Sequence, residues 1–360
     1  MIFSPDEEYL PPAGEGIASL MEKYFGNRYE KQILFQPIGE KGQAKLSNST
    51  VTIIGLGALG TVSSNHLCRA GIGKLKLVDR DFVEISNLQR QLLFDEQDAL
   101  KRLPKAEAAA EKLRAINSEI SIEALVADVA PRSIEKVIEG SDLVLDGTDN
   151  LETRLLINDA CLKNKIPWIY AAVLGSVGMT MTIVPHRTPC LRCHISSMPA
   201  PGAIPGCDTE GVLSMTTGTI ASIQSAEALR LLTGLEPKEG LFYIDVWQRD
   251  FETFHLERLP DCPACGAGSF DFLNGTNFSW TTVLCGRNAV QIVPPAEKRI
   301  VLEELEKRLK PLGEITFNGF LLSLKTEGHE IVLFPNGRAI IRGTTDEAEA
   351  RSIYARYIGT

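Results

Sequence analysis

Four of the eight cysteines stand in two C-x-x-C pairs, Cys190 with Cys193 and Cys262 with Cys265. This spacing lets two thiolates of one turn bind the same ion, and four thiolates complete a tetrahedral zinc site. Because no coordination position then stays open, the zinc would be structural and would join the two ends of the segment between the pairs. The alternatives are a redox disulfide at either pair or buried thiols without a ligand.

The remaining cysteines have no such spacing. Cys207 lies in a loop without strand or helix periodicity, where a thiolate could accept an activated acyl group. An incidental surface thiol explains the position equally well. Cys68 and Cys161 fall within predicted helices and are expected in the core. The sequence indicates no role for Cys285.

A glycine-rich turn, Gly55-Leu-Gly57-Ala-Leu-Gly60, follows a predicted strand and begins a predicted helix. Its glycines let the backbone approach a nucleotide, and the helix N-terminus favours phosphate oxygens. Asp79 ends the next predicted strand, where a carboxylate accepts hydrogen bonds from ribose hydroxyls. These residues predict a nucleotide site. A dinucleotide-dependent dehydrogenase would show them too, and a tight turn without a ligand is the remaining alternative.

Amides and cations follow this strand closely. Asn87, Arg90 and Gln91 lie in one short loop, and Lys105 stands at the start of a predicted helix. Departure of pyrophosphate from ATP needs such a cluster because negative charge builds on the leaving group, whereas hydride transfer does not. The cluster therefore favours ATP over a nicotinamide cofactor, with a solvated surface loop as the alternative.

A further predicted strand ends at Leu145 and runs into Asp146-Gly-Thr-Asp149-Asn150. The carboxylate of Asp149 is placed to bind Mg²⁺ through oxygen, the ligand atom that this ion prefers. The pattern therefore predicts a magnesium ligand at position 149.

The elements that must position these residues alternate short β-branched runs with helical stretches from about Thr50 onward. This alternation is typical of α/β proteins with a Rossmann-like, doubly wound sheet. Strands are predicted at 51–54, 74–78, 121–125 and 142–145, and helices at 58–70, 104–116, 151–164 and 215–232. The last helix is apolar nearly all round and is expected to be buried.

After Trp168 strand follows strand, so the sheet is expected to be parallel first and then antiparallel. It is expected to finish with a hairpin at 241–246 and 251–256. The uncharged stretch 166–185 is expected to form two strands rather than a membrane span, because glycines interrupt its β-branched and small residues.

The composition shifts near residue 270, through Gly266, Gly268 and Gly275, and a domain boundary is expected there. The residues beyond it predict a small α+β domain with strands at 320–326, 330–334 and 339–342 and a turn at Asn336-Gly337. A helix is predicted at 297–309, with four apolar residues on one side: Ile300, Val301, Leu305 and Leu309.

Composition limits the class of protein. The chain has 360 residues, of which 44% are hydrophobic and 23% charged, and this is typical of globular proteins. Its 37 basic and 46 acidic residues give a net charge of −9, which argues against a nucleic-acid partner. The first residues lack the basic start and apolar stretch of a signal peptide, so a cytoplasmic protein with no membrane partner is expected.

With these parts together, the chain from about residue 28 to residue 265 resembles the MoeB/ThiF/HesA family, the bacterial relatives of ubiquitin-activating enzymes. The glycine turn and both cysteine pairs match the family. The other matching motifs are Arg28-Tyr29-x-x-Gln32, Asn87-Leu-Gln-Arg90-Gln91, Pro104-Lys105, Gly147-Thr-Asp149-Asn150, Glu210-Gly-Val and Ser225-x-Glu227-Ala-x-Arg230-Leu-Leu. Lys31 stands where the family often has arginine.

The resemblance implies roles for these residues. Asp79 would bind ribose, and Asp149 would organise magnesium. Arg28 would reach the γ-phosphate bound to the neighbouring subunit, which implies a homodimer. Cys207 aligns with a cysteine that takes part in sulfur transfer in ThiF-like members and is dispensable in MoeB-like members. The residues implied to contact the triphosphate are Asn87, Arg90, Gln91 and Lys105.

The function that the resemblance implies is ATP-dependent adenylylation of the terminal glycine carboxylate of a ubiquitin-like sulfur-carrier protein ending in Gly-Gly, with release of pyrophosphate. It would serve sulfur transfer in cofactor biosynthesis of the thiamine or molybdopterin type. The expected division of the chain is an N-terminal extension (1–27), an adenylation domain with a structural zinc site (28–269) and a C-terminal α+β domain of unknown role (270–360).

Three alternatives remain open. The first is a same-fold adenylyltransferase that acts on a peptide or a tRNA nucleoside. The second is an NAD-dependent dehydrogenase, and the third a zinc scaffold without activity.

Overall fold

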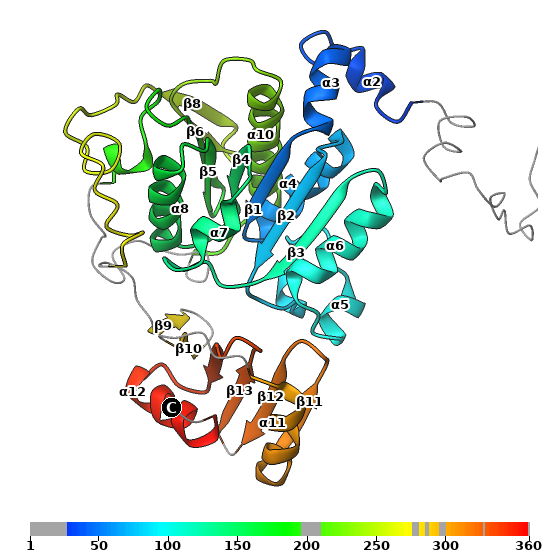
Figure 1. Ribbon diagram of the computed structural model, residues 1–360, viewed down its shortest axis with the longest axis vertical. Coiled ribbons are helices and arrows are strands. Elements are labelled where there is room, and N and C mark those ends of the chain that lie inside the picture. The colour runs from blue at the N-terminus through cyan, green and yellow to red at the C-terminus, as the bar shows by residue number, and fades with distance from the viewer. Residues whose placement is uncertain are drawn as a thin grey trace, which may run out of the picture.

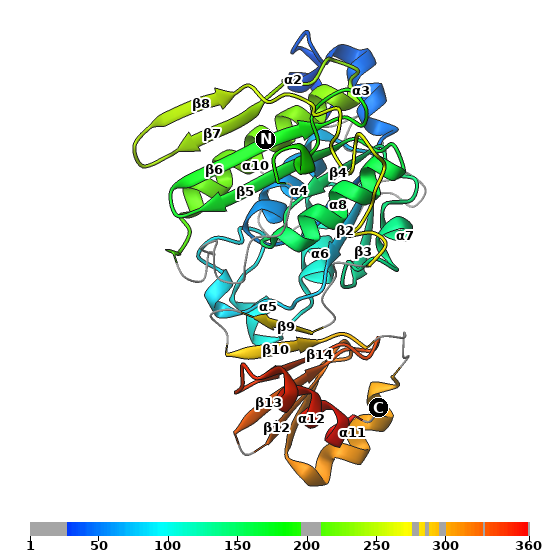
Figure 2. The ribbon, with the colours of Figure 1, turned by 90° about the vertical axis from the view of Figure 1, so that its left-hand side faces the viewer.

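The computed structural model describes residues 27–195, 210–275, 281–284, 288–294, 300–326 and 328–358. Within these residues the strands form two sheets, one of eight strands and one of six (Figure 1). The large sheet and its helices are built from residues up to 275, and the small sheet from residues after 280. In Figures 1 and 2 the small sheet lies against the side of the large domain that carries the short helix α5 (Glu96–Leu100).

The large sheet has the strand order β3-β2-β1-β4-β5-β6-β7-β8. Neighbouring strands are parallel from β3 to β5 and antiparallel from β5 to β8. This confirms the predicted doubly wound sheet, parallel first and antiparallel afterwards. Its strands are β1 (Thr50–Ile54), β2 (Lys74–Asp79), β3 (Ser121–Val126), β4 (Leu143–Asp146), β5 (Trp168–Leu174), β6 (Val177–Ile183), β7 (Leu241–Asp245) and β8 (Asp250–Phe254).

Helices cover both faces of this sheet because its buried strands carry apolar side chains on both sides. In β1, Val51 and Ile53 pack with one core, and Ile54 packs with the other. The first core is covered by α3 (Gly39–Ser47), α4 (Ala58–Ala70), α6 (Lys105–Ile116) and part of α10 (Ser214–Leu232); the second is covered by α7 (Ile134–Ile138) and α8 (Leu151–Lys163). The short elements are α2 (Glu30–Ile33), α5 and the 3₁₀ turns η1 (Ile85–Asn87) and η2 (Leu191–Cys193).

The predicted strand pair at 166–185 is confirmed as β5 and β6, which turn at Gly175 with φ 58°. Among the described residues, no helix is both long enough and apolar enough to span a membrane. The helix α10 is buried on one face only, since Ile220 and Ala228 are fully buried while Met215 is 64% exposed. Burial all round was therefore wrong: α10 packs on α4, β5 and β6, while Met215 on another side of the helix is exposed in the part of the chain that the structure describes.

The small sheet is antiparallel, with the order β11-β12-β13-β14-β10-β9. Its strands are β9 (Thr281–Leu284), β10 (Ala289–Ile292), β11 (Glu314–Phe317), β12 (Leu322–Thr326), β13 (His329–Leu333) and β14 (Ala339–Arg342). One face packs on α11 (Leu302–Leu309), which continues into η3 (Lys310–Leu312), and on α12 (Glu347–Tyr357). The three predicted strands and the turn at Asn336-Gly337 are confirmed as β12 to β14, whereas β9, β10, β11 and α12 were not predicted.

The predicted phase of the helix in this domain was wrong. The helix α11 begins at Leu302, and its buried stripe is Leu302, Leu305 and Leu309. Val301 precedes the first helical residue and is 49% exposed. Residues three and seven apart share a helix face, so Leu302 rather than Val301 continues the stripe toward the sheet.

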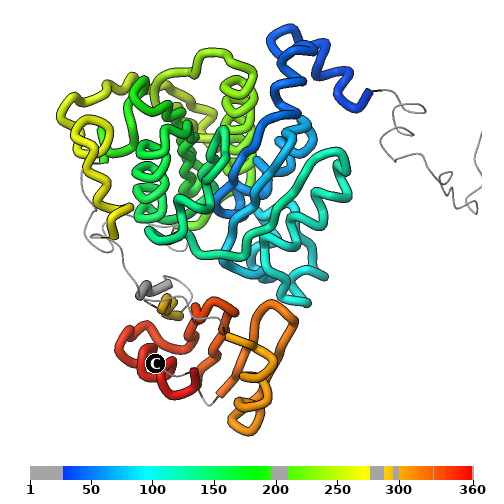
Figure 3. Tube along the Cα trace, in the orientation of Figure 1, coloured from blue at the N-terminus to red at the C-terminus, as the bar shows by residue number. Residues whose placement is uncertain are grey.

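The described part of the large domain ends at Gly275. Figure 3 shows the tube of the small domain, orange to red, beside that of the large domain. Phe272 and Leu273 are still buried in the core beside α8, with 2% and 7% of their surface exposed. The large domain therefore extends at least to Leu273, and the first strand of the small sheet, β9, begins at Thr281.

Candidate nucleotide site and metal centre

The glycine turn lies at the point where the direction of the sheet reverses. From β1 the chain runs to β2 and β3 on one side, and it then returns to β4 on the other side of β1. In open α/β sheets this switch point, at the carboxyl ends of the strands, is where ligands bind. Gly55 follows β1 and Gly147 follows β4, and a Cβ atom on Gly147 would lie 2.3 Å from the carbonyl oxygen of Gly55.

The same turn begins α4, whose N-cap is Gly57. No side chain among the described residues caps this helix, so the N–H groups of its first turn stay available to an anion. Gly60 lies against the turn so closely that a Cβ atom there would be 1.9 Å from the carbonyl oxygen of Gly55. The spacing of the glycines thus follows from the contact of turn, helix and strand.

Asp79, at the end of β2, is bound to the turn. Its Oδ2 accepts a hydrogen bond from the N–H of Leu56 at 2.6 Å, and its Oδ1 accepts one from the N–H of Asp81 at 2.7 Å. Burial raises the pKa of Asp79, while the ammonium of Lys105 acts in the opposite direction. The carboxylate is therefore fixed beside the glycine turn, as a ribose ligand needs to be.

The predicted triphosphate ligands follow on the segment between β2 and α6. The Nζ of Lys105 lies 3.9 Å from Oδ2 of Asp81, and this lysine is 4% exposed. Asn87 is buried, and its Oδ1 accepts a hydrogen bond from the N–H of Glu84 at 3.1 Å. Arg90 donates from Nη1 to the carbonyl oxygen of Ser86 at 2.9 Å.

Among the predicted triphosphate ligands, Gln91 has a buried polar atom without a partner in the described residues. Its side chain is 3% exposed, and its buried Oε1 has no hydrogen-bond partner in the described part of the chain. Buried polar atoms in folded proteins almost always have a partner, which can be a ligand or an ordered water. This atom is therefore compatible with a site that is completed by a bound molecule.

The loop after β4 is organised by Asp146, for which no role was predicted from the sequence. Asp146 is fully buried, and its Oδ1 accepts hydrogen bonds from the N–H and Oγ1 of Thr148 at 2.9 and 2.7 Å. Its Oδ2 pairs with Nε of Arg154 at 3.2 Å. The only sequence signal was an acidic residue at the end of an apolar strand, directly before Gly147.

Asp149 itself is exposed on this loop. Burial would lower the pKa of Arg80, but the nearby carboxylates of Asp128, Asp81 and Asp149 raise it overall. Burial would also lower the pKa of Arg154, but the carboxylate of Asp146 and, more weakly, that of Asp149 raise it overall. Asp149 thus lies within electrostatic reach of both arginines, for which no role was predicted from the sequence either.

Arg28 does not join this cluster within one chain. Its Nη1 donates to the carbonyl oxygen of Ile116 at 3.2 Å, and its Nε pairs with Glu119 at 3.3 Å. Ile116 is the last residue of α6 and Lys105 the first. At 1.5 Å per residue the two ends of this helix are about 16 Å apart.

The four cysteines of the C-x-x-C pairs come together. Cys190 directly precedes η2 and Cys193 is its last residue, and Cys262 and Cys265 lie in the loop after β8. All four Sγ atoms lie within 4.8 Å of one another, with distances of 3.6 Å between Cys190 and Cys262 and 3.5 Å between Cys193 and Cys265. Four sulfurs bound to zinc at 2.3 Å are about 3.8 Å apart, so the thiols fit a tetrahedral site and no disulfide is present among them.

The negative charges of the four cysteine thiolates favour a bound cation. Burial and the neighbouring thiolates raise the pKa of Cys190, and burial raises that of Cys265 to about 11. Burial also acts on Cys262, but hydrogen bonds from the backbone N–H groups of Cys265 and Ala264 lower its pKa. A divalent ion would reverse the repulsion among four buried thiolates.

The helix α8 holds the segments of both C-x-x-C pairs in place. Asn158 accepts a hydrogen bond from the N–H of Leu191 at 3.0 Å, and Asp159 accepts one from the N–H of Phe272 at 3.0 Å. Burial raises the pKa of Asp159 to about 6. These two side chains therefore tie the segments on either side of the cysteine cluster to one buried helix.

The remaining cysteines divide into two groups. Cys68 and Cys161 are completely buried in the core, as predicted, and burial raises the pKa of Cys68 to about 11. Cys207 and Cys285 lie outside the described residues, so the structure does not test whether either forms a covalent intermediate.

Comparison with known proteins places the chain among adenylyltransferases. Residues 29–264 match the sequence profile of the ThiF family. The chain is 45% identical over 335 residues to the sulfur carrier protein ThiS adenylyltransferase of Bacillus subtilis, with 92% of this chain and 99% of that relative covered. It is 39% identical over 254 residues to the SAMP-activating enzyme E1 of Haloferax volcanii, covering 70% of this chain and 93% of that relative.

Among solved structures, Escherichia coli MccB determined with AMPCPP and MccA is similar, with a TM-score of 0.60 and 26% identity over 68% of this chain and 76% of that chain. The same enzyme with ATP gives a TM-score of 0.60 and 26% identity, covering 68% and 75%. Coverage of 92% by the Bacillus subtilis relative means that most of the small C-terminal domain is shared with that relative.

Proposed function

The chain belongs to the ThiF family, and on this basis we propose that it uses ATP to adenylylate the C-terminal glycine carboxylate of a ubiquitin-like sulfur-carrier protein. The observation that supports this most strongly is the 45% identity to a ThiS adenylyltransferase over 99% of that relative. The geometry agrees, because the glycine turn, Asp79 and Lys105 lie together at the switch point. The proposed carrier ends in Gly-Gly and serves cofactor biosynthesis of the thiamine or molybdopterin type.

In the proposed reaction a carboxylate oxygen of the carrier attacks the α-phosphorus of ATP. The new oxygen–phosphorus bond gives an acyl-AMP, the bond from the α-phosphorus to the bridging oxygen breaks, and pyrophosphate leaves with the electron pair. No general base is needed because a carboxylate is already ionised at neutral pH. The chain would contribute positioning of the two reactants and stabilisation of charge on the leaving group.

The residues of the proposed site contact different parts of ATP. The backbone of Gly55, Gly57 and Gly60 allows phosphates to approach the first turn of α4. The carboxylate of Asp79 accepts from the ribose hydroxyls, and Asn87, Arg90, Gln91 and Lys105 contact the triphosphate. Among these, Lys105 and Arg90 carry the positive charge that opposes the charge developing on pyrophosphate.

Asp149 is the proposed magnesium ligand. Its exposed carboxylate at the switch point fits this role, because Mg²⁺ is usually bound by one or two carboxylates together with substrate phosphates. When bound, the ion would neutralise part of the triphosphate charge. The closed cysteine cluster is the proposed zinc site, and its role is structural because four thiolates leave no position for a substrate.

A homodimer is the proposed assembly, with Arg28 of one subunit acting on the γ-phosphate bound by the other. The distance along α6 supports this, since Arg28 lies at the end of the helix opposite to Lys105 of its own chain. Substitution of Arg28 by alanine would then weaken ATP use by the neighbouring subunit, and mixing it with a variant inactive at Arg90 would restore part of the activity.

The second candidate is a same-fold adenylyltransferase with another substrate, such as a peptide. The similarity to MccB, solved with both AMPCPP and MccA, favours this candidate over a dehydrogenase. Its lower identity, 26% against 45%, makes it the weaker of the two proposals.

Carrier-dependent exchange of radioactive pyrophosphate into ATP tests the proposal. The purified chain should catalyse this exchange with magnesium and a Gly-Gly-tailed carrier, and not with a carrier that lacks the terminal glycine. Arg90→Ala should lower the exchange strongly. Absence of exchange with every such carrier, despite ATP binding, would overturn the carrier assignment, and normal activity of Arg90→Ala would refute the role of the cationic loop.

A further inference from the structure

The small C-terminal sheet has two faces, and the face away from α11 and α12 contacts the large domain. Its buried cluster contains Leu321, Val332, Phe334 and Ile340, and the one member from the large domain is Phe82. Phe82 is 4% exposed, and its ring packs against the face of the small sheet that is turned away from α11 and α12. It lies three residues after Asp79 and near the start of the segment that carries the proposed triphosphate ligands.

Arg338, directly before β14, reaches the large domain beside Phe82. It is 2% exposed, and its Nη2 donates a hydrogen bond to the carbonyl oxygen of Arg80. Its Nη1 lies 3.8 Å from Oδ1 of Asp81 and donates to Oε1 of Gln291 at 3.1 Å. The side chain of Gln291 in turn donates to Oδ2 of Asp128 at 3.2 Å, so two residues of the small domain hold the residues that follow β2 and β3.

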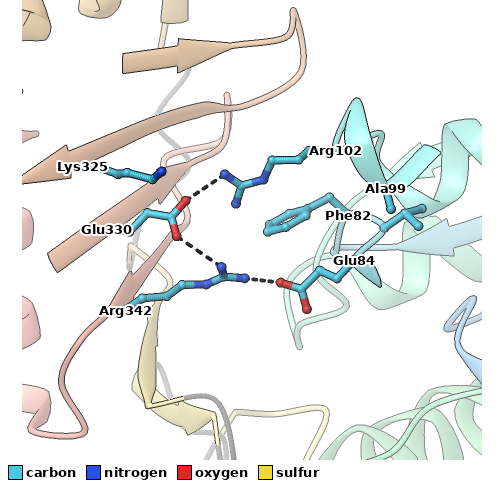
Figure 4. Close-up of a pocket in the computed structure, with 8 residues that line it drawn as sticks. Phe82, Glu84, Ala99, Arg102, Lys325, Glu330 and Arg342 are labelled. Carbon is cyan, nitrogen blue, oxygen red and sulfur yellow. Dashed lines mark hydrogen bonds and ion pairs between the residues drawn. The ribbon is translucent and has the colours of Figure 1, made fainter. Parts of the chain in front are cut away.

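A second group of contacts is an ion-pair network around a cleft of about 300 Å³ between the two domains (Figure 4). Arg342 of β14 pairs with Glu84 of the large domain, and it also pairs with Glu330 at 3.2 Å. Glu330 in turn pairs with Arg102 of the large domain at 2.8 Å. The guanidinium of Arg102 lies over the ring of Phe82, 4.5 Å from its centroid.

Further along the segment, Asn318 donates from Nδ2 to the carbonyl oxygens of Lys101 and Arg102 at 3.1 and 2.9 Å. The small domain therefore contacts the segment 80–104 at its beginning and at its end. Between these contacts the segment contains only η1 and α5, of three and five residues. Helical turns this short supply few hydrogen bonds of their own, although the two ends of the segment bond to each other, from the N–H of Val83 to the carbonyl oxygen of Leu103 at 2.8 Å. The small domain therefore holds these joined ends from outside.

From this arrangement we propose that the C-terminal domain is a positioning clamp for the phosphate-binding segment, and that Arg338 is its principal positioning residue. The proposal rests on the proposed function, because it assigns the clamp to the residues that would bind ATP. Arg338 touches no substrate. It holds Arg80 and Asp81, and Asp81 is bound to the same Asp79 and faces the same Lys105 that the proposed site uses.

The placement of charge supports a role of Arg338 beyond packing. Three carboxylates, Asp79, Asp81 and Asp128, converge at the carboxyl ends of β2 and β3, and Arg338 and Lys105 are among the cations that face them. Without Arg338, Asp81 would lose one of its cationic neighbours and would compete more strongly for Lys105. A lysine drawn toward Asp81 is less available to the triphosphate of ATP, so ATP binding should weaken while carrier binding should not.

The test compares full-length variants by ATP binding, measured by calorimetry without carrier, and by exchange kinetics. Arg338→Met should raise the Kd and the KM for ATP about tenfold or more and leave the KM for the carrier within about twofold, whereas a loss of folded protein alone would lower kcat at unchanged KM. Arg338→Lys keeps the charge and should restore part of the ATP affinity. Arg308→Met is the matched control, because within the described residues Arg308 donates to carbonyl oxygens of its own domain, those of Tyr357 and Ile358.

Arg342→Met provides a second variant, since Arg342 is partly exposed and its loss is easier for the fold to tolerate. It should raise the KM for ATP about threefold, and it decides the question alone if Arg338→Met does not fold. ATP affinity equal to that of the wild type in the folded clamp variants would overturn the proposal. Failure of the carrier-dependent exchange in the wild type would refute the proposed substrate. The clamp is tested separately, because ATP binding is measured without carrier.

Discussion

The contact between the loops after β1 and β4 can be tested by a single methyl group. In Gly147→Ala the new Cβ atom would lie 2.3 Å from the carbonyl oxygen of Gly55 and 3.1 Å from the backbone of Gly60. Ordinary contact begins at 3.4 Å, so the two loops must separate by about 1 Å. The obstacle is backbone on both sides, and no rotation of a side chain can relieve it.

Two effects should follow from this displacement. Overpacking of this kind costs about 1–3 kcal/mol of the free energy of unfolding. A shift of about 1 Å in residues that position a substrate can lower the rate about 100-fold. We therefore expect Gly147→Ala to lower the urea midpoint, followed by circular dichroism, and to lower kcat/KM in pyrophosphate exchange about 100-fold.

Gly218→Ala is the matched control, because a Cβ atom at this position of α10 meets nothing within 4 Å. Alanine in a helix interior is favoured over glycine by about 1 kcal/mol, so this variant should be slightly more stable and equally active. If Gly147→Ala matched the wild type in both the urea midpoint and the exchange rate, steric contact of the two loops could not be the reason for glycine at this position.

Four further outcomes follow from the site. Asp149→Ala should lower exchange about 100-fold with little change in thermal midpoint, because the carboxylate is exposed; retained exchange would remove it as a magnesium ligand. Cys207→Ala should keep full adenylation even if a later transfer step is blocked, and loss of exchange would contradict this. Cys193→Ser should release zinc, measured by elemental analysis, and lower the thermal midpoint; an unchanged zinc content would refute the four-cysteine site. Asp159 has a folded-state pKa of about 6 against an ordinary 3.8, so its protonated form stabilises the fold at low pH and this contribution is lost as the pH rises through 6. Between pH 4 and pH 7 the wild type should therefore lose on the order of 2 kcal/mol relative to Asp159→Asn, and a constant difference in urea unfolding across that range would contradict the shift.

The parallel part of the large sheet could be predicted because each strand and helix there carries a local signal. β1 is an apolar run that ends in glycine, and α6 begins with Pro104 as its N-cap, the kind of position where a missing N–H is tolerated. The small domain was predicted less well. β10 and β11 are only four residues long and, unlike the equally short β14, contain polar residues among their apolar ones, so neither run is recognised until its partners in the sheet are known.

The prediction of which α11 residues face the sheet was limited in a similar way. Ile300, Val301 and Leu302 are three consecutive apolar residues, so periodicity alone cannot say which of them faces the sheet. The start of the helix at Leu302 decided the question and left Val301 exposed. For α10, the apolar pattern gave no information about how much of the helix a neighbouring element would cover.

The sequence by itself determined the types of chemistry at the site. Glycine spacing after an apolar strand, an acidic residue at the next strand end and two C-x-x-C pairs are local patterns, and local backbone geometry is enough to give them meaning. Only the tertiary structure decided which distant residues meet: Gly147 against Gly55, Asp146 with Arg154, and Arg338 against Arg80. The physical reason is that these contacts depend on the order of strands in a sheet and on how two sheets pack, and neither leaves a periodic signal in the residues that finally touch.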